Sequence, residues 1–126
     1  MSKFGNEFDP IGVVVDWIDA CRERNLSALI ALYDDNATVD CCEGGRFQGR
    51  PQVEQYWRSK LTSPAAKAIK IDALMPEADG VSLDYRSYDG QPVRTHFRFN
   101  AAGKIIQTAC RQVGHDNSGP KTSFAA

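Results

Sequence analysis

The second half of the chain constrains the fold most, because from residue 65 onward apolar and polar side chains alternate. In residues 69–75 every second residue is apolar, which is the spacing of a strand with one buried face. Two more such runs, residues 81–87 and 91–100, flank the turn residues 88–90, and a fourth run covers residues 104–113. Short turns between consecutive strands predict an antiparallel meander.

The turn Tyr88-Asp89-Gly90 can be closed in two ways, which bring opposite strand faces together. A two-residue turn would place Arg86 beside Val93 and Asp84 beside Thr95. A three-residue loop with Gly90 in the bulge position gives the pairs Tyr85 with Val93, Leu83 with Thr95, Val81 with Phe97 and Asp84 with Arg94. We choose the three-residue loop, because it produces one apolar face and one face of paired charges.

Two helices are expected at the start of the chain. For the first, from about residue 10 to residue 24, Asp9 is a capping acid and Pro10 suits the first turn. Its apolar residues recur at intervals of three and four. A second, shorter helix has an apolar side that ends with Tyr33, and Asp34-Asp35-Asn36 is then interpreted as a turn.

A first strand is expected at residues 37–42, before the turn Gly44-Gly45. The run Gly49-Arg50-Pro51 then opens a third helix, which Ser63-Pro64 closes. Its buried face is expected to contain Val53, Tyr56, Trp57 and Leu61. Helices followed by a series of strands give an α+β fold. A curled sheet with helices on one face leaves a concave apolar space, which is where ligands usually bind.

The composition is that of one globular domain. We expect this domain at residues 10–113, between a flexible N-terminus (1–9) and a flexible tail (114–126). The net charge of −1 gives no reason to expect nucleic acid or an anionic membrane as a partner, and no apolar run approaches the roughly 20 residues of a membrane span. The start of the chain lacks a secretory signal, so a cytoplasmic protein with reduced cysteine thiols is expected.

Two separated segments resemble a known superfamily. IALYDDNATV (residues 30–39), followed by Gly49 before a helix, resembles the steroid delta-isomerase and SnoaL-like families of the nuclear transport factor 2-like superfamily. HFRFNAAGKI (residues 96–105) resembles the strand–turn–strand near their C-terminal end. The resemblance implies a cone-shaped, curved antiparallel sheet packed on three N-terminal helices, with a central pocket. It also implies a homodimer formed through the sheet.

Three groups of the steroid isomerases can be matched to positions in this sequence. The tyrosine that donates a hydrogen bond to the oxyanion falls on Trp17, and the aspartate that moves the proton falls on Cys41. A protonated acid of the oxyanion hole falls on Thr95, while Tyr33 matches a tyrosine that supports the donor in some isomerases. A thiol without a cationic neighbour is a poor base, and indole and hydroxyl groups are weaker donors than a tuned acid. Classical steroid isomerisation is therefore not expected.

Asp40 and Cys41 are the candidate catalytic residues. By strand alternation Cys41 faces the pocket, where it could also serve as a small apolar wall residue. Asp40 faces away, unless the glycines after it turn it inward; burial would then raise its pKa toward that of a useful base. No metal site is expected from Asp40, Cys41 and Cys42, because their spacing is not that of metal ligands.

The expected pocket lining combines aromatic helix residues with one face of the sheet. It contains Trp17, Tyr33, Tyr56, Trp57, Leu83, Tyr85, Thr95, Phe97, Thr108, Cys110 and Gln112. The last three match cavity positions of the resembling isomerases. Epoxide hydrolases of this superfamily use an Asp-Arg-Asp set inside the pocket, which Asp84 and Arg94 would mimic only with the two-residue turn.

The expected function is binding of a small hydrophobic molecule in the cone pocket, with a lyase or isomerase reaction on a carbonyl compound. The alternative is a non-catalytic binder or a protein-interaction module of the same fold. A carboxylate inside the cavity would favour the enzyme, whereas a wall of aromatic rings, thiols and hydroxyls would favour the binder. The sequence has no cofactor motif, so no cofactor is expected.

Overall fold

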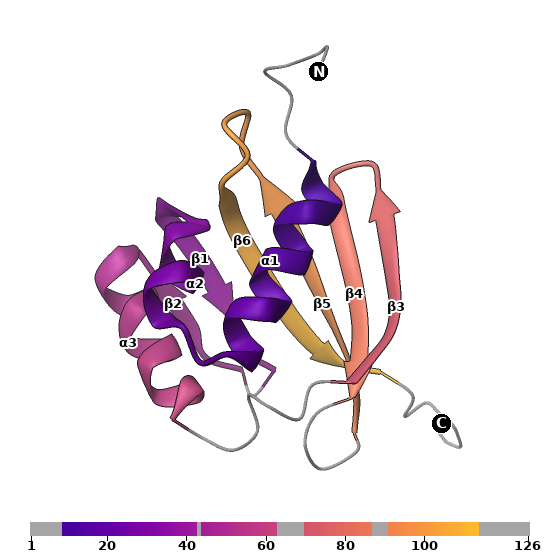
Figure 1. Cartoon of the computed structure of the whole chain (residues 1–126), viewed down its shortest axis with the longest axis horizontal. Helices are drawn as coiled ribbons and strands as arrows, with labels where there is room; N and C mark the ends of the chain where they lie inside the picture. The colour runs from indigo at the N-terminus through magenta and orange to yellow at the C-terminus, as the bar shows by residue number, and fades with distance from the viewer. Residues whose placement is uncertain (1–8, 43, 63–69, 87–90, 114–126) are drawn as a thin grey trace.

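The computed structural model describes residues 9–42, 44–62, 70–86 and 91–113. In these residues three helices pack on one curved, unclosed six-stranded sheet (Figure 1). The helices are α1 (Pro10–Arg22), α2 (Leu26–Ala31) and α3 (Arg50–Leu61). The strands are β1 (Tyr33–Asp40), β2 (Arg46–Gln48), β3 (Lys70–Glu77), β4 (Gly80–Arg86), β5 (Pro92–Phe99) and β6 (Ile105–Gln112). The expected α+β class, with three N-terminal helices on a curved sheet, is confirmed.

The strand order across the sheet is β2-β1-β6-β5-β4-β3. Neighbouring strands are antiparallel, except that β1 runs parallel to β6. Figure 1 shows α1 crossing one face of the sheet in front of β4, β5 and β6, while α2 and α3 lie beside β1 and β2. We call the face covered by these helices the inner face, and the opposite face the outer face.

Helix α1 forms as the sequence predicts. Asp9 caps it by accepting a hydrogen bond from the backbone nitrogen of Ile11 at 3.1 Å, and the stripe that contains Val14 and Trp17 is buried. The helix ends at Arg22, two residues earlier than expected. Arg24 has a positive φ of 56°, which a right-handed helix does not allow, and the next residue caps α2.

The β4–β5 register is that of the three-residue loop. Leu83 pairs with Thr95 and Asp84 pairs with Arg94. The alternation of apolar and charged residues was sufficient to select this register, because the alternative would have placed charged side chains on the inner face. The turn residues 88–90 themselves lie outside the described residues.

Strand β1 begins earlier than expected, at Tyr33. Asp34-Asp35-Asn36, interpreted as a turn, belongs to the strand. Its pairing with β6 is irregular between Tyr33 and Thr38, so this polar run occupies a distorted part of β1. The short strand β2 was not expected; it pairs with the end of β1 after a turn in which Cys41 N donates to Gly45 O at 2.7 Å.

Strand β3 changes face along its length. Strict alternation placed Ile71, Ala73 and Met75 on one face. A register shift between Ile71 and Ala73 moves the following residues by one position. Leu74 therefore packs against the core together with Ile71, and the expectation for Ala73 and Met75 is wrong.

Cys42 and Cys110 form a disulfide that joins the loop after β1 to β6. The expectation of reduced thiols is wrong for these two residues, while Cys21 and Cys41 remain thiols. The two half-cystines are 68 residues apart in the sequence, and the parallel pairing of β1 with β6 brings them together. Nothing in the spacing of the cysteines indicated that pairing.

Some expectations fall on residues that the structure does not describe. These are the flexible N-terminus, apart from Asp9, the tail at 114–126 and the end of the third helix at Ser63-Pro64. Within the described chain, no helix is both long enough and apolar enough to cross a membrane.

Candidate functional site

The inner face of the sheet holds a buried polar centre built on Tyr33, which is 1% exposed. Its hydroxyl oxygen accepts hydrogen bonds from the indole nitrogens of Trp17 and Trp57, each at 3.2 Å. The same oxygen lies 3.4 Å from Thr108 Oγ1. Because the oxygen accepts twice, its own hydrogen is available to Thr108. Burial raises the pKa of Tyr33 to about 12, so this hydroxyl stays protonated at neutral pH.

Four distant segments supply this centre. Trp17 comes from the buried stripe of α1, and Trp57 comes from α3. Thr108 lies on β6 beside Val39 of β1, so it shares the inner face with Tyr33. The structure thus brings together four of the expected pocket residues. Their polar groups bond one another, and the indole N–H that the resemblance assigns to an oxyanion is already donated to Tyr33.

A row of aromatic rings runs from the core to a partly exposed edge. The distances between ring centroids are 5.0 Å from Phe97 to Trp17, 5.6 Å from Trp17 to Trp57, 5.1 Å from Trp57 to Tyr56 and 4.7 Å from Tyr56 to Phe47. Phe97 and Trp17 are buried, whereas Trp57, Tyr56 and Phe47 are half-buried. We call these five rings the aromatic row. Its half-buried end can stack against a flat molecule.

Two further hydroxyl groups lie near this row. Tyr56 donates its hydroxyl to Cys41 Sγ at 3.6 Å, and the Tyr85 hydroxyl lies 3.2 Å from Thr95 Oγ1. Burial raises the pKa of both tyrosines, so both hydroxyls are neutral hydrogen-bonding groups at neutral pH. Thr95 is 3% exposed and Cys41 is half-buried. Four of the expected site residues therefore form two hydrogen-bonded pairs, Tyr56 with Cys41 and Tyr85 with Thr95.

Asp40 lies on the outer face, as strand alternation predicts, because its neighbour Val39 is buried on the inner face. Its carboxylate accepts hydrogen bonds from Arg46 Nε at 2.6 Å and from Gln107 Nε2 at 2.9 Å. The hydrogen bond from Arg46 holds the pKa of Asp40 below its usual range. A paired carboxylate that stays ionised is a weak proton acceptor.

Asp84 is also on the outer face. Arg94 donates to its two oxygens at 2.6 and 2.9 Å and thereby lowers its pKa. The Asp-Arg pair therefore does not enter the interior in the manner of the epoxide hydrolase set. Within the described residues, side chains able to ligate a metal come together at Glu77, Asp79 and His96, again on the outer face.

The remaining pocket candidates have different positions. Leu83 is fully buried in the core. Cys110 is held in the disulfide, and Gln112 is exposed at the end of β6. Phe47, at the outer end of the aromatic row, is not among the pocket residues expected from the sequence. It is an isolated apolar residue in the short strand β2, and that isolation was the available signal.

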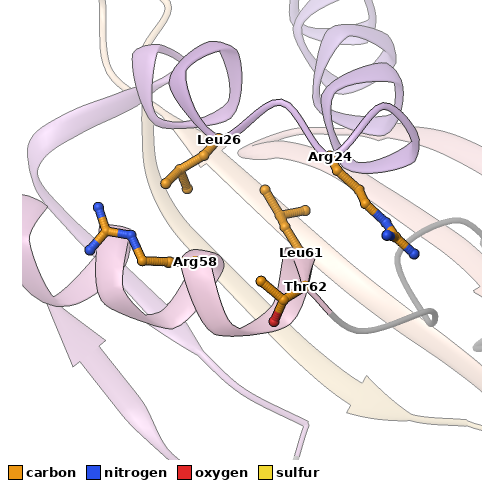
Figure 2. Close-up of a pocket in the computed structure, with 5 residues that line it drawn as sticks. All are labelled: Arg24, Leu26, Arg58, Leu61 and Thr62. Carbon is orange, nitrogen blue, oxygen red and sulfur yellow. The ribbon is translucent and has the colours of Figure 1, made fainter.

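A separate open cavity of about 430 Å³ lies outside this interior (Figure 2). It opens between the α1–α2 connection and the C-terminal end of α3. Its lining residues are Arg24, Leu26, Arg58, Leu61 and Thr62. None of them was among the expected pocket residues, so this cavity differs from the predicted pocket in place and in chemistry.

The sequence pattern of the SnoaL-like domain matches residues 14–108. A SnoaL-like protein of unknown function from Burkholderia thailandensis has a TM-score of 0.73 at 23% identity, covering 82% of this chain and 93% of that chain. A putative polyketide cyclase from Sinorhizobium meliloti has a TM-score of 0.66 at 20% identity, with 82% and 100% covered. SalBIII, an epoxide hydrolase/cyclase-like enzyme in pyran ring formation in the polyether salinomycin, has a TM-score of 0.67 at 18% identity, with 82% and 90% covered. At these identities the structures share a fold.

Proposed function

Because this chain belongs to the SnoaL-like domain family, we propose that it binds a small hydrophobic molecule at the inner face of its sheet. The observation that carries the proposal is the aromatic row, which starts in the core and ends in the half-buried rings of Trp57, Tyr56 and Phe47. Half-buried aromatic rings in a row are costly to leave in water and favourable to cover with a flat apolar ligand.

The polar groups beside the row indicate what else the ligand carries. The hydroxyls of Tyr56, Tyr85 and Thr95 are neutral and can exchange their present partners for a ligand oxygen. Apolar walls with a few neutral hydrogen-bonding groups favour a molecule with a carbonyl or hydroxyl oxygen over an ion. The proposed ligand class is therefore a flat hydrophobic carbonyl compound.

The names of two structural neighbours support an organic, oxygen-bearing ligand. One is described as a putative polyketide cyclase, and SalBIII is described as acting in pyran ring formation. The positions of Asp40 and Asp84 on the outer face favour binding over acid–base catalysis by either carboxylate. We therefore infer a small-molecule binder as the first candidate function.

The test uses the intrinsic fluorescence of the protein, because its two tryptophans, Trp17 and Trp57, both belong to the aromatic row. The full chain is titrated with fluorenone, acetylnaphthalene and testosterone as flat carbonyl probes, and with dodecanoate as a straight-chain control. We expect saturable quenching by at least one flat carbonyl probe at micromolar concentration and none by dodecanoate. Absence of saturable quenching by all three flat probes, up to their solubility limits, would contradict the proposal.

Two matched variants locate the binding. Phe47→Ala shortens the half-buried end of the aromatic row, so we expect the affinity to fall about tenfold, the scale of losing one buried aromatic contact. Arg24→Ala alters the cavity of Figure 2 and should leave the affinity unchanged. The opposite pattern, with loss in Arg24→Ala alone, would assign the ligand to that cavity instead.

A second candidate is a lyase or isomerase that acts on the bound carbonyl compound. It is favoured by the half-buried Cys41 thiol, which Tyr56 contacts at the edge of the aromatic row. The probes that bind are incubated with the protein and analysed by mass spectrometry and NMR. If Cys41→Ser abolishes conversion but retains binding, this candidate is supported. If conversion survives the substitution, Cys41 has no role in the reaction.

A further inference from the structure

The outer face carries a cluster of four polar side chains that the proposed ligand site does not use. Glu77 ends β3, Asp79 lies in the turn that follows, Ser82 is on β4 and His96 is on β5. Ser82 and His96 are directly opposed in the β4–β5 register. The turn between β3 and β4 brings the carboxylates of Glu77 and Asp79 together beside His96. The cluster is therefore formed by the geometry of the β3–β4 hairpin.

The imidazole of His96 has hydrogen-bond acceptors at both ring nitrogens. Nδ1 lies 3.0 Å from Ser82 Oγ and 3.2 Å from Glu77 Oε1, while Nε2 lies 3.2 Å from Asp79 Oδ1. Ser82 Oγ donates to Glu77 Oε1 at 3.0 Å. In the tautomer in which Nδ1 carries the ring hydrogen, the Ser82 oxygen accepts that hydrogen while the Ser82 hydroxyl hydrogen goes to Glu77.

In that tautomer the lone pair of a neutral His96 is on Nε2, the nitrogen that faces Asp79. A lone pair opposite a carboxylate oxygen at 3.2 Å is repulsive unless a positive charge lies between the two atoms. A metal cation supplies such a charge and uses both atoms as ligands. A second ring proton is the competing explanation.

We propose that His96 Nε2, Asp79 and Glu77 bind a divalent transition-metal ion of the zinc type on the outer face. One imidazole nitrogen of His96 and one carboxylate oxygen each from Glu77 and Asp79 lie within 4.8 Å of one another. Rotation of the Glu77 side chain from Nδ1 toward Nε2 would allow metal–ligand bonds of about 2.0–2.2 Å. One imidazole and two carboxylates suit zinc, cobalt or manganese rather than a soft copper(I) ion. Water completes the coordination.

Ser82 is a positioning residue in this site. It is 2% exposed and holds Nδ1, so it fixes the tautomer and the ring plane that present Nε2 to the ion, the usual arrangement around a metal-bound histidine. Its burial also argues against a hydrolytic role for the Ser82, His96 and Asp79 side chains, because a substrate cannot reach the Ser82 oxygen. The cluster is therefore a binding site rather than a nucleophile with its base.

The test is a calorimetric titration of the full chain with zinc chloride alone. We expect one ion per chain, with Asp79→Asn and His96→Gln each weakening binding about 10- to 100-fold and Ser82→Ala about tenfold. Asp72→Asn is the matched control. Asp72 is an exposed acid on β3, the strand that ends with Glu77, and it forms an ion pair with Arg86. Its substitution should leave the zinc affinity unchanged. Equal zinc affinity in Asp79→Asn, or no binding to the wild-type chain, would overturn the proposal.

Cobalt(II) and NMR separate the two competing explanations. The absorption spectrum of the cobalt-loaded protein should show nitrogen and oxygen ligation without a thiolate charge-transfer band. A thiolate band would place the ion on a cysteine and contradict the proposal.

The NMR experiment starts from the metal-free protein. When zinc is added, the nitrogen signal of His96 Nε2 should shift. A ring that stays doubly protonated at saturating zinc would instead assign the positive charge to the imidazolium.

Discussion

At the scale of single residues, Tyr33 connects several elements of the interior through one hydroxyl group. Its hydroxyl satisfies the indole N–H groups of both tryptophans and contacts Thr108. Trp17 is 2% exposed, so water cannot replace the oxygen that its N–H bonds. One phenolic oxygen on β1 therefore connects α1, α3 and β6 around the proposed ligand site.

Tyr33→Phe tests this role. Removing the hydroxyl leaves the buried Trp17 N–H without an acceptor, so we expect the free energy of unfolding to fall by about 1–3 kcal/mol. Urea denaturation followed by circular dichroism measures the change. Tyr85→Phe removes a hydroxyl whose partner among the described residues is Thr95; it is the control and should cost less. A Tyr33→Phe protein as stable as the wild type would contradict this account.

Tyr33 also predicts a loss of stability in alkali. Burial raises its pKa from 10 to about 12, so between these values the unfolded chain releases a proton that the folded protein keeps. The folded state then binds more protons, and stability falls as pH rises through this window. The loss approaches about 2–3 kcal/mol from this residue. Urea unfolding at rising pH should show a decline that is smaller in Tyr33→Phe, and an equal decline in both proteins would contradict the assignment.

The sequence predicts which residues lie in the interior better than it predicts the hydrogen bonds between them. Trp17 and Trp57 were expected on buried helix faces because helical spacing is a local property. Their hydrogen bonds to Tyr33 join residues 16 and 24 positions apart, and the bond to Thr108 joins residues 75 apart. Such contacts depend on how the helices pack on the sheet, and no spacing rule contains that information.

At the scale of elements, the hairpin of β4 and β5 shows when a local pattern is sufficient. Its register followed from the alternation that keeps Asp84 and Arg94 off the inner face. The bulge in β3 was not foreseen, because Ala73 and Leu74 are both apolar and either could face the core. Cys42 and Cys110 were missed for a related reason, since strand alternation alone gives no contact between β1 and β6.

Gly80, at the start of β4, has no room for a larger side chain. A Cβ atom on Gly80 would overlap the backbone carbonyl oxygen of Phe97 on β5, so Gly80→Ala must push the two strands apart. We expect a loss of about 3 kcal/mol in the free energy of unfolding. Gly12→Ala, in α1 where the three nearest atoms to a Cβ belong to the Asp9 side chain, is the control. The helix propensity gained by alanine offsets the displacement of the Asp9 cap, so the change in the free energy of unfolding should stay within about 1 kcal/mol. Equal stability of the two variants in urea would contradict the close approach of β4 and β5.

The disulfide predicts a second effect at this scale. It closes a loop of 68 residues between β1 and β6, so its removal should lower the free energy of unfolding by about 2–4 kcal/mol. The double variant Cys42→Ser, Cys110→Ser is compared with Cys41→Ser, which leaves the disulfide intact. Mass spectrometry after denaturation and alkylation of the unreduced wild-type protein should find two alkylated cysteines, because the two half-cystines cannot react. Four alkylated cysteines in that sample would contradict the disulfide.

At the scale of the whole molecule, the two faces of the sheet have different chemistry. The inner face carries aromatic rings and neutral hydroxyls, and the outer face carries paired charges such as Asp84 with Arg94 and the cluster around His96. The sequence predicted this division, because alternation assigns each strand residue to one face. This division is the basis for proposing an apolar ligand at the inner face and a cation at the outer face.

The most direct test of the inner-face site uses the two indole N–H signals of Trp17 and Trp57 in a proton–nitrogen NMR spectrum, assigned with Trp57→Phe. Fluorenone is added to the labelled full chain. The account predicts that the Trp57 indole signal shifts most, because that ring is half-buried in the aromatic row. Unchanged indole signals, with shifts confined to the amides of residues 24–26 and 58–62 around the cavity of Figure 2, would contradict it.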